Sequence, residues 1–100
     1  MILYNTTYSV ANDVAADWFR WLKTDHIPHL LATGLPTGHR VLRLLTELDN
    51  GGTTYSVQLD FTAMEDYFAF QTQYADAMQQ RIEDRFAGQY VSFDTLLEDS

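Results

Sequence analysis

Hydrophobic and polar residues alternate in four separate stretches of the chain, at residues 2–11, 39–48, 53–61 and 89–98. This period of two is typical of β-strands, and the stretches are rich in β-branched and aromatic residues. In residues 53–61, for example, Tyr55, Val57, Leu59 and Phe61 fall on one face and polar residues on the other. The pattern therefore predicts four strands.

Apolar residues recur at helical spacing in the two longer segments between these strands. In the first segment we expect a helix with Asn12 as its N-cap, then an interruption at Pro28 and a short second piece capped by Asp25. Gly34 ends that segment. In the second segment we expect one helix over residues 63–86, whose apolar residues form one stripe, with Gly88 as its C-cap.

The predicted order of elements is βαββαβ, the ferredoxin-like arrangement, within a single domain of residues 1–100. Asp49-Asn50-Gly51-Gly52 is a strong hairpin signal between the second and third strands. We expect an α+β fold in which two helices cover one face of a four-stranded antiparallel sheet.

The sheet face without helices is predicted to be mostly polar, but the strand at residues 39–48 has apolar residues in both phases. Such a strand is expected only where both of its faces are covered. We therefore expect a homodimer that packs sheet against sheet, a dimeric α/β barrel; the alternative is a monomer with a few exposed leucines. The expected polar residues of this face are Asn5, Thr7, Ser9, Ser56, Gln58, Asp60, Ser92 and Asp94.

Composition narrows the classes of partner. Fourteen acidic residues against six basic ones give a net charge of −8, which disfavours nucleic acid and anionic membranes. Cysteine is absent, so thiolate metal sites and cysteine nucleophiles are excluded. The N-terminus lacks the features of a signal peptide and no apolar run is long enough for a membrane span. We expect a soluble cytoplasmic protein.

Several short motifs together carry a family resemblance. They are Trp18-x-x-Trp21, His26-Ile27-Pro28, Thr33-Gly34, Arg40-x-x-Arg43-Leu44-Leu45 and Phe93-x-Thr95-Leu96-Leu97-Glu98. Over the whole chain they resemble the small bacterial family of domains of unknown function numbered 4286, similar in layout to the dimeric α/β-barrel superfamily. That superfamily includes antibiotic-biosynthesis monooxygenases, EthD-like proteins and stress-responsive barrel proteins.

The resemblance implies a homodimer with a pocket in each subunit between sheet and helices. Two functions follow from it as expectations. One is a binding or regulatory module with no established reaction. The other is a cofactor-independent monooxygenase, cyclase or isomerase-like enzyme that acts on a small aromatic or polyketide-like compound, with His26 as general base.

His26 is the residue on which the enzyme interpretation depends. The topology is expected to bring it near Tyr4, Asp60, Met64 and Tyr67, where a histidine beside an acid and a tyrosine could move a proton. The alternative is a structural histidine bonded to a backbone carbonyl at the Pro28 kink. The expected aromatic and apolar walls of a ligand pocket are Trp18, Trp21, Phe68 and Met64.

Two further candidates are weaker. Arg43 stands between leucines and is expected to pair with Asp60 or Asp94, or alternatively to clamp an anionic ligand. His26 and His29 have the spacing of two zinc ligands on a helix, but Pro28 lies between them and the ligand set is incomplete. No nucleotide-binding or hydrolase motif is present. We therefore expect no metal and no cofactor.

Overall fold

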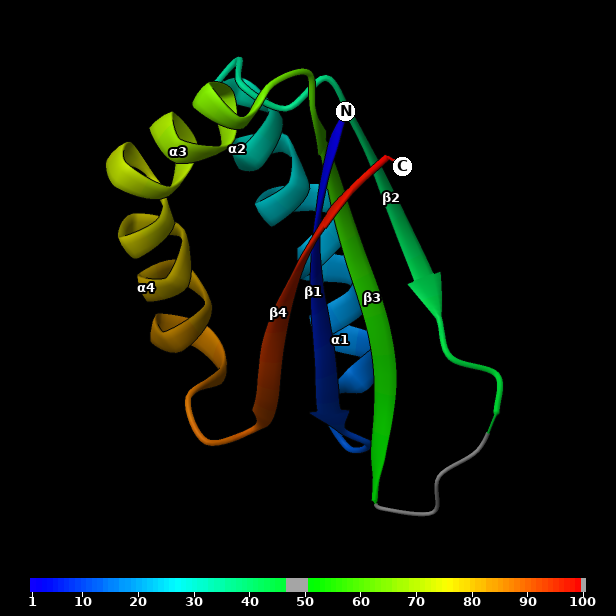
Figure 1. The fold of residues 1–100 in the computed structure, drawn as a ribbon. Coiled ribbons are helices and arrows are strands. Elements are labelled where there is room, and N and C mark those ends of the chain that lie inside the picture. The colour runs from blue at the N-terminus through cyan, green and yellow to red at the C-terminus, as the bar shows by residue number, and fades with distance from the viewer. Residues whose placement is uncertain (47–50, 100) are drawn as a thin grey trace.

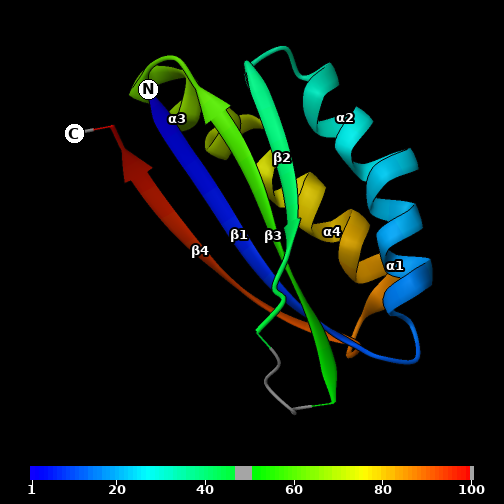
Figure 2. The same cartoon turned by 90° about the vertical axis from the view of Figure 1, so that its right-hand side faces the viewer.

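The computed structural model describes residues 1–46 and 51–99 and has the predicted βαββαβ order. The four strands are β1 (Ile2–Ala11), β2 (Gly38–Arg43), β3 (Gly52–Phe61) and β4 (Tyr90–Glu98). They form one antiparallel sheet in the order β2-β3-β1-β4. The helices all lie on one face of this sheet (Figures 1 and 2), so the ferredoxin-like prediction is confirmed.

The first helical segment differs from its prediction in detail. It runs without interruption through α1 (Ala15–Trp21), a π-helical turn η1 (Leu22–His26) and α2 (Ile27–Ala32). Pro28 does not break it, because the wide π turn comes directly before the proline and absorbs the backbone carbonyls that its ring would otherwise displace. The helix ends as expected before Gly34, whose φ is 78°.

Neither predicted N-cap forms. Asn12 instead accepts a hydrogen bond from the Thr53 hydroxyl, 2.9 Å away, and so ties the β1 end to β3. The N-cap position is Val14, which has no capping side chain. Asp25 lies inside the continuous helix, where the backbone amides are already bonded, and its carboxylate turns to α4 instead.

The second helical segment is two helices rather than one, α3 (Met64–Gln73) and α4 (Ala75–Phe86). The break is at Tyr74, whose φ of −127° and ψ of −23° are not helical. Hydrogen bonds from Tyr74 to Phe70 and from Met78 to Tyr74 keep the two helices joined. Because no glycine or proline marks this position, tertiary packing rather than local sequence selects the bend, which Figure 1 shows between the two helices.

Strand β2 is shorter than predicted and ends at Arg43. Residues 44–46 leave the strand, although the Leu44 amide still bonds to the Thr54 carbonyl at 2.9 Å. Residues 47–50, which include the rest of the predicted strand and the Asp49-Asn50 half of the hairpin signal, lie outside the described residues. Among the described residues, no helix is long and apolar enough to cross a membrane.

The core lies between the sheet and the helices. Trp18 and Trp21 are both buried, as predicted, and Trp18 packs between Tyr8 and Tyr55 at 5.1 Å from each ring centre. The inward faces of β1 and β3 supply most of the remaining contacts, in the phases that the alternation predicted. The buried sheet residues are Ile2, Tyr8, Val10, Tyr55, Val57, Leu59 and Phe61.

The phase of β4 is opposite to its prediction. Its register with β1 places Ser92 beside Tyr8 and Asp94 beside Thr6, so both face the helices and not the open face. Val91 and Phe93 face away from the helices instead and are 70% and 64% exposed. The prediction was wrong because β4 has apolar residues in both phases, and alternation alone does not say which phase is inside.

This correction makes the helix-free face more apolar than expected. Leu42 of β2 also lies on it, whereas Val41 pairs with Val57 and faces the core. Phe93 and Leu42 are both exposed there. An exposed apolar patch of this kind marks an interaction surface more often than a solvated one.

Candidate functional site

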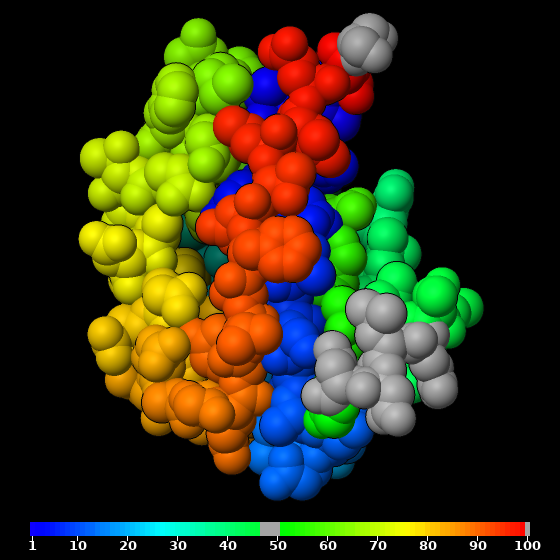
Figure 3. All heavy atoms as spheres, turned by 60° about the horizontal axis from the view of Figure 1, so that its bottom comes forward, coloured from blue at the N-terminus to red at the C-terminus, as the bar shows by residue number. Residues whose placement is uncertain are grey.

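A pocket with a cavity volume of about 120 Å³ lies between the sheet and the helices. Residues of β1, β3 and β4 form one side of it, and residues of α2, α3 and α4 form the other. Figure 3 shows the molecule hollowed between β4 and the α3–α4 pair. The lining residues are Tyr4, Thr6, Tyr8, His26, Leu30, Val57, Leu59, Phe70, Ala75, Met78, Gln79, Ile82, Ser92, Phe93 and Asp94.

His26 lines this pocket from the last position of the π turn. Such turns occur often at functional sites, because the extra residue re-aims the side chains that follow it. The imidazole is only 3% exposed and stacks on Trp21, with 4.8 Å between ring centres and 19° between planes. Stacking fixes the ring orientation without using either nitrogen.

Neither nitrogen of His26 has a hydrogen-bond partner in the part of the chain that the structure describes. Nδ1 is sealed from solvent and unpartnered. Nε2 is not sealed, and it too bonds to no described residue. A backbone bond at the Pro28 kink, one sequence-based alternative for this histidine, is therefore not formed. An unpaired buried polar group is costly, so its persistence here requires an explanation.

The environment keeps the imidazole neutral. Burial and the nearby guanidinium of Arg81 lower the pKa of His26 to about 4, against a smaller opposing effect of Asp25. At pH 7 the ring therefore has one N–H donor and one bare nitrogen acceptor.

The opposite wall of the pocket has a hydrogen-bonded acid. The Tyr4 hydroxyl donates to Oδ2 of Asp94 across the β1–β4 pair, at 2.9 Å. Burial, and to a smaller extent Asp94, raise the pKa of Tyr4 to about 12, so the phenol stays protonated. Burial also raises the pKa of the neighbouring Tyr8.

The lining is mixed: seven of its fifteen residues are polar or titratable, and the other eight are apolar. Small-molecule sites likewise combine apolar surface with convergent polar groups. The polar groups fix orientation and the apolar surface supplies most of the binding free energy.

The structure brings together only part of the predicted site. Tyr4 and His26 both line the pocket. Asp60 does not, because it alternates with buried Leu59 and Phe61 and so lies on the other side of the sheet. Tyr67 packs on the Tyr4 ring at 5.3 Å but is not part of the lining.

The structure also places the four predicted wall residues outside the pocket lining. Trp18 is sealed in the core and Met64 packs on that core from α3. Trp21 reaches the pocket only through its stacking on His26. Phe68 is 58% exposed, because it points away from the sheet side of α3.

Arg43 forms no ion pair with Asp60 or Asp94. It pairs with Tyr55 at one end of β2, whereas Asp60 pairs with Gly38 at the other end. Asp94 is on the far strand of the sheet and bonds to Tyr4. Arg43 therefore does not reach the pocket.

Asp94 is the main functional candidate that the sequence did not single out. The missing information was the register of β4, which decides whether the carboxylate faces helices or solvent. The apolar character of Val91 and Phe93 predicts that they face the helices, and this places Asp94 on the wrong face. If the helix-free face is covered by a second copy, as the sequence predicts for residues 39–48, apolar Val91 and Phe93 can also lie on that face.

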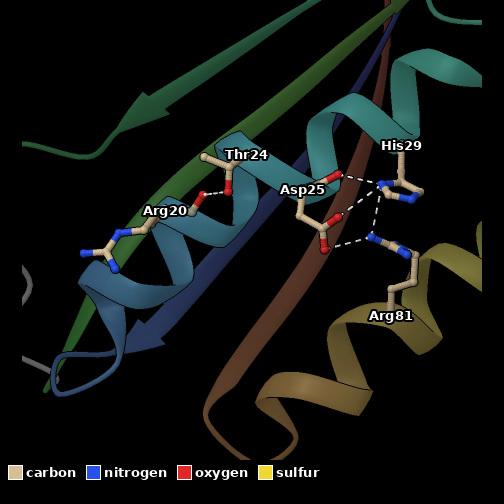
Figure 4. A network of polar contacts seen from close by, with 5 residues as sticks. All are labelled: Arg20, Thr24, Asp25, His29 and Arg81. Atoms are coloured by element: carbon tan, nitrogen blue, oxygen red, sulfur yellow. Dashed lines mark hydrogen bonds and ion pairs between the residues drawn. The ribbon is translucent and has the colours of Figure 1, made fainter.

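A polar cluster beside the pocket joins the first helical segment to α4 (Figure 4). Arg81 NH2 lies 3.0 Å from Oδ2 of Asp25, and Oδ1 of Asp25 lies 3.3 Å from Nδ1 of His29. Nδ1 of His29 also lies 2.8 Å from the Asp25 carbonyl. Within the described residues, no three histidine, aspartate or glutamate side chains gather as ligands for a metal ion.

The chain matches one protein family over its whole length. The family described as "Domain of unknown function (DUF4286)" matches residues 1–100. No curated protein matches the chain significantly.

Solved structures match over nearly the full length, at low sequence identity. A putative antibiotic biosynthesis monooxygenase from Deinococcus radiodurans has 10% identity and a TM-score of 0.70, with 100% of this chain and 93% of that chain covered. The cofactor-independent oxygenase SnoaB from Streptomyces nogalater, as its N63A mutant, has 13% identity and a TM-score of 0.70, with 98% and 91% covered.

An ethyl tert-butyl ether d (EthD) family protein from Bacillus halodurans has 9% identity and a TM-score of 0.68, with 100% of both chains covered. These matches are to proteins of the dimeric α/β-barrel superfamily. At such identities they establish the shared fold.

Proposed function

The chain belongs to the DUF4286 family, and from its pocket we propose that it is a homodimeric binding protein for a small, uncharged ring compound. One observation carries the proposal. His26 lines a pocket of mixed polar and apolar residues as a neutral imidazole, and neither of its nitrogens has a hydrogen-bond partner among the described residues. A ligand atom is the partner that this arrangement lacks.

The size of the cavity sets the size of the ligand. An engineered cavity of about 150 Å³, lined by apolar side chains, holds one benzene molecule. At about 120 Å³ the pocket accommodates a single six-membered ring or a slightly smaller group. Because the pocket opens between β4 and α4, substituents can extend from the ring towards solvent (Figure 3).

The charge of the pocket sets the charge of the ligand. Asp94 is the only lining residue with a formal charge at neutral pH, since His26 is neutral. A carboxylate in the ligand would meet this negative charge, within a chain of net charge −8. An uncharged ligand that hydrogen-bonds to the polar walls fits better.

The proposed partner of the protein is a second copy of itself, packed on the helix-free face. Exposed Val91, Phe93 and Leu42 lie on that face, together with polar residues of β1 and β3 that can pair across an interface. The resemblance to the dimeric α/β-barrel superfamily supports the same arrangement. An isologous interface brings the same patch together from both copies.

Calorimetric titration with benzamide and benzoate tests the ligand proposal, because these two rings differ mainly in charge. We expect benzamide to bind with one site per chain and benzoate to bind at least tenfold more weakly. Ala75→Leu narrows the pocket and should weaken benzamide binding, whereas Ala77→Leu, on the exposed side of the same helix, is the matched control. Equal affinity for both compounds, or equal effects of the two variants, would overturn the proposal.

A second candidate function is an enzyme that needs no cofactor, with His26 as general base. Its support is the unbonded Nε2 atom at the pocket and the fold that the chain shares with SnoaB, which is described as a cofactor-independent oxygenase. In such a reaction the base removes a proton, and the resulting carbanion is oxidised by dioxygen. The imidazole must then present a bare nitrogen to the pocket.

Oxygen uptake measures this second function. An aromatic ketone with a ring CH2 group acidified by its carbonyl should consume dioxygen in the presence of the protein, and His26→Asn should abolish the uptake while Asp60→Asn, on the other face of the sheet, leaves it unchanged. Uptake that survives in His26→Asn removes the enzyme candidate.

A further inference from the structure

Two sealed polar atoms without partners lie in facing helical elements, Nδ1 of His26 in η1 and Nε of Arg81 in α4. They are two of the three such side-chain atoms in the described residues; the third is the indole nitrogen of Trp18 in the core. Arg81 is also the charged group that acts most strongly on His26. The charge of Arg81 therefore acts on the imidazole of His26.

The orientation of Arg81 is fixed from outside. Its NH2 atom is held at 3.0 Å by the Asp25 carboxylate (Figure 4). The other oxygen of that carboxylate lies 3.3 Å from His29. With its outer end bound, the guanidinium keeps its Nε–H in the protein interior, where the atom is sealed.

The chemistry of these atoms selects one tautomer of His26. Arginine Nε is only a donor and stays charged, so a second N–H at Nδ1 would place donor and cation together without an acceptor. A bare Nδ1 avoids this arrangement and leaves the ring proton on Nε2, the nitrogen that is not sealed. Asp25 does not reverse this preference, because its carboxylate is paired with the Arg81 guanidinium at 3.0 Å.

We infer that Arg81 is a positioning residue that keeps Nδ1 of His26 bare and the proton on Nε2. His26 then presents an N–H donor to the pocket, so the ligand must offer an acceptor there, such as a carbonyl oxygen. On the opposite wall, Asp94 accepts from donors. This last step rests on the proposed binding function, and it names the ligand class as a neutral ring with a carbonyl acceptor and a separate N–H or O–H donor.

The same assignment separates the two candidate functions. A protonated Nε2 donates to a ligand and does not remove a proton from it, whereas the general-base role needs a bare nitrogen at the pocket. The location of one proton therefore distinguishes a binding site from a base-catalysed reaction.

Nitrogen-15 NMR of the imidazole rings at pH 7.5 measures this location directly, because protonated and bare ring nitrogens resonate in separate regions. In the unmodified protein we expect His26 as the Nε2–H tautomer. Arg81→Met should shift the population towards Nδ1–H, and Arg81→Lys, which keeps the charge, should restore most of it. Arg85→Met, on the same helix, is the matched control and should leave the spectrum of His26 unchanged.

Each result decides the inference independently of ligand binding. A proton on Nδ1 in the unmodified protein overturns it, even if every Arg81 variant fails to fold. An unchanged tautomer in folded Arg81→Met also overturns it. Benzamide, added to saturation, should perturb Nε2 more than Nδ1; absence of binding contradicts the proposed function, while the spectrum of the free protein still decides the role of Arg81.

Discussion

The buried neutral imidazole of His26 predicts a specific dependence of stability on pH. In the unfolded chain an ordinary histidine titrates near pH 6.5, whereas in the folded protein the pKa of His26 falls to about 4. The unfolded state therefore binds more protons between these two values, and the free energy of unfolding increases with pH in that window. The contribution is complete above about pH 6.5 and is lost progressively as the pH falls to about 4.

The magnitude follows from the width of the window. A difference of one pKa unit corresponds to about 1.4 kcal/mol, so the full contribution is roughly 3 kcal/mol. At pH 5.0 the unfolded imidazole is almost fully protonated and the folded one only about one tenth protonated, which gives a loss of about 2 kcal/mol relative to pH 7.5. Burial is the main cause of the lowered pKa of His26. Of the charged groups, Arg81 and Asp25 have the largest effects on this pKa, and the two effects have opposite signs.

Urea unfolding at pH 7.5 and pH 5.0 measures this loss. The two pH values stay above the range in which most aspartate and glutamate side chains titrate. We expect the unmodified protein to lose about 2 kcal/mol more than His26→Gln between them. His29→Gln is the control, because His29 is half exposed, and it should behave as the unmodified protein does. Equal losses in the His26→Gln variant and the unmodified protein would refute the reasoning.

Three further predictions follow from packing and from the sheet face. Trp18→Ala should cost about 3–5 kcal/mol of unfolding free energy in urea titration, because the residue is fully buried; a cost below about 1 kcal/mol would show that it is not core. Val91→Glu should convert the proposed dimer to a monomer in light scattering, while Phe68→Glu, exposed on α3, should not; a dimer in both contradicts the interface. Tyr4→Phe, which removes the bond to Asp94, should cost about 1–2 kcal/mol in urea unfolding, and no cost would mean that the bond contributes nothing.

The sequence was sufficient for the fold because the strand and helix periods are both clear and alternate in the βαββαβ order. The interruption expected at Pro28 failed for a local reason: a proline ends a helix only where the preceding turn cannot adapt, and the π turn does adapt. The break at Tyr74 carries no local signal and depends on packing.

The site was predictable only in part. The sequence brings His26 and Tyr4 together because their elements and phases are predicted correctly, and both line the pocket; their role there stays a prediction. Asp60 was misplaced because adjacency at one end of a sheet does not fix the face on which a side chain lies. Asp94 was missed because the phase of β4 follows from its pairing with β1, which is a long-range contact and is not encoded in the local pattern.

We propose that a neutral ring compound binds beside His26 in the pocket between sheet and helices. A map of backbone amide chemical shifts during titration with benzamide locates the binding site residue by residue. We expect saturable shifts at one site per chain, centred on His26, Asp94 and Met78, all of which line the pocket. Shifts centred on the helix-free face, or no shifts at concentrations where benzamide remains soluble, would contradict it.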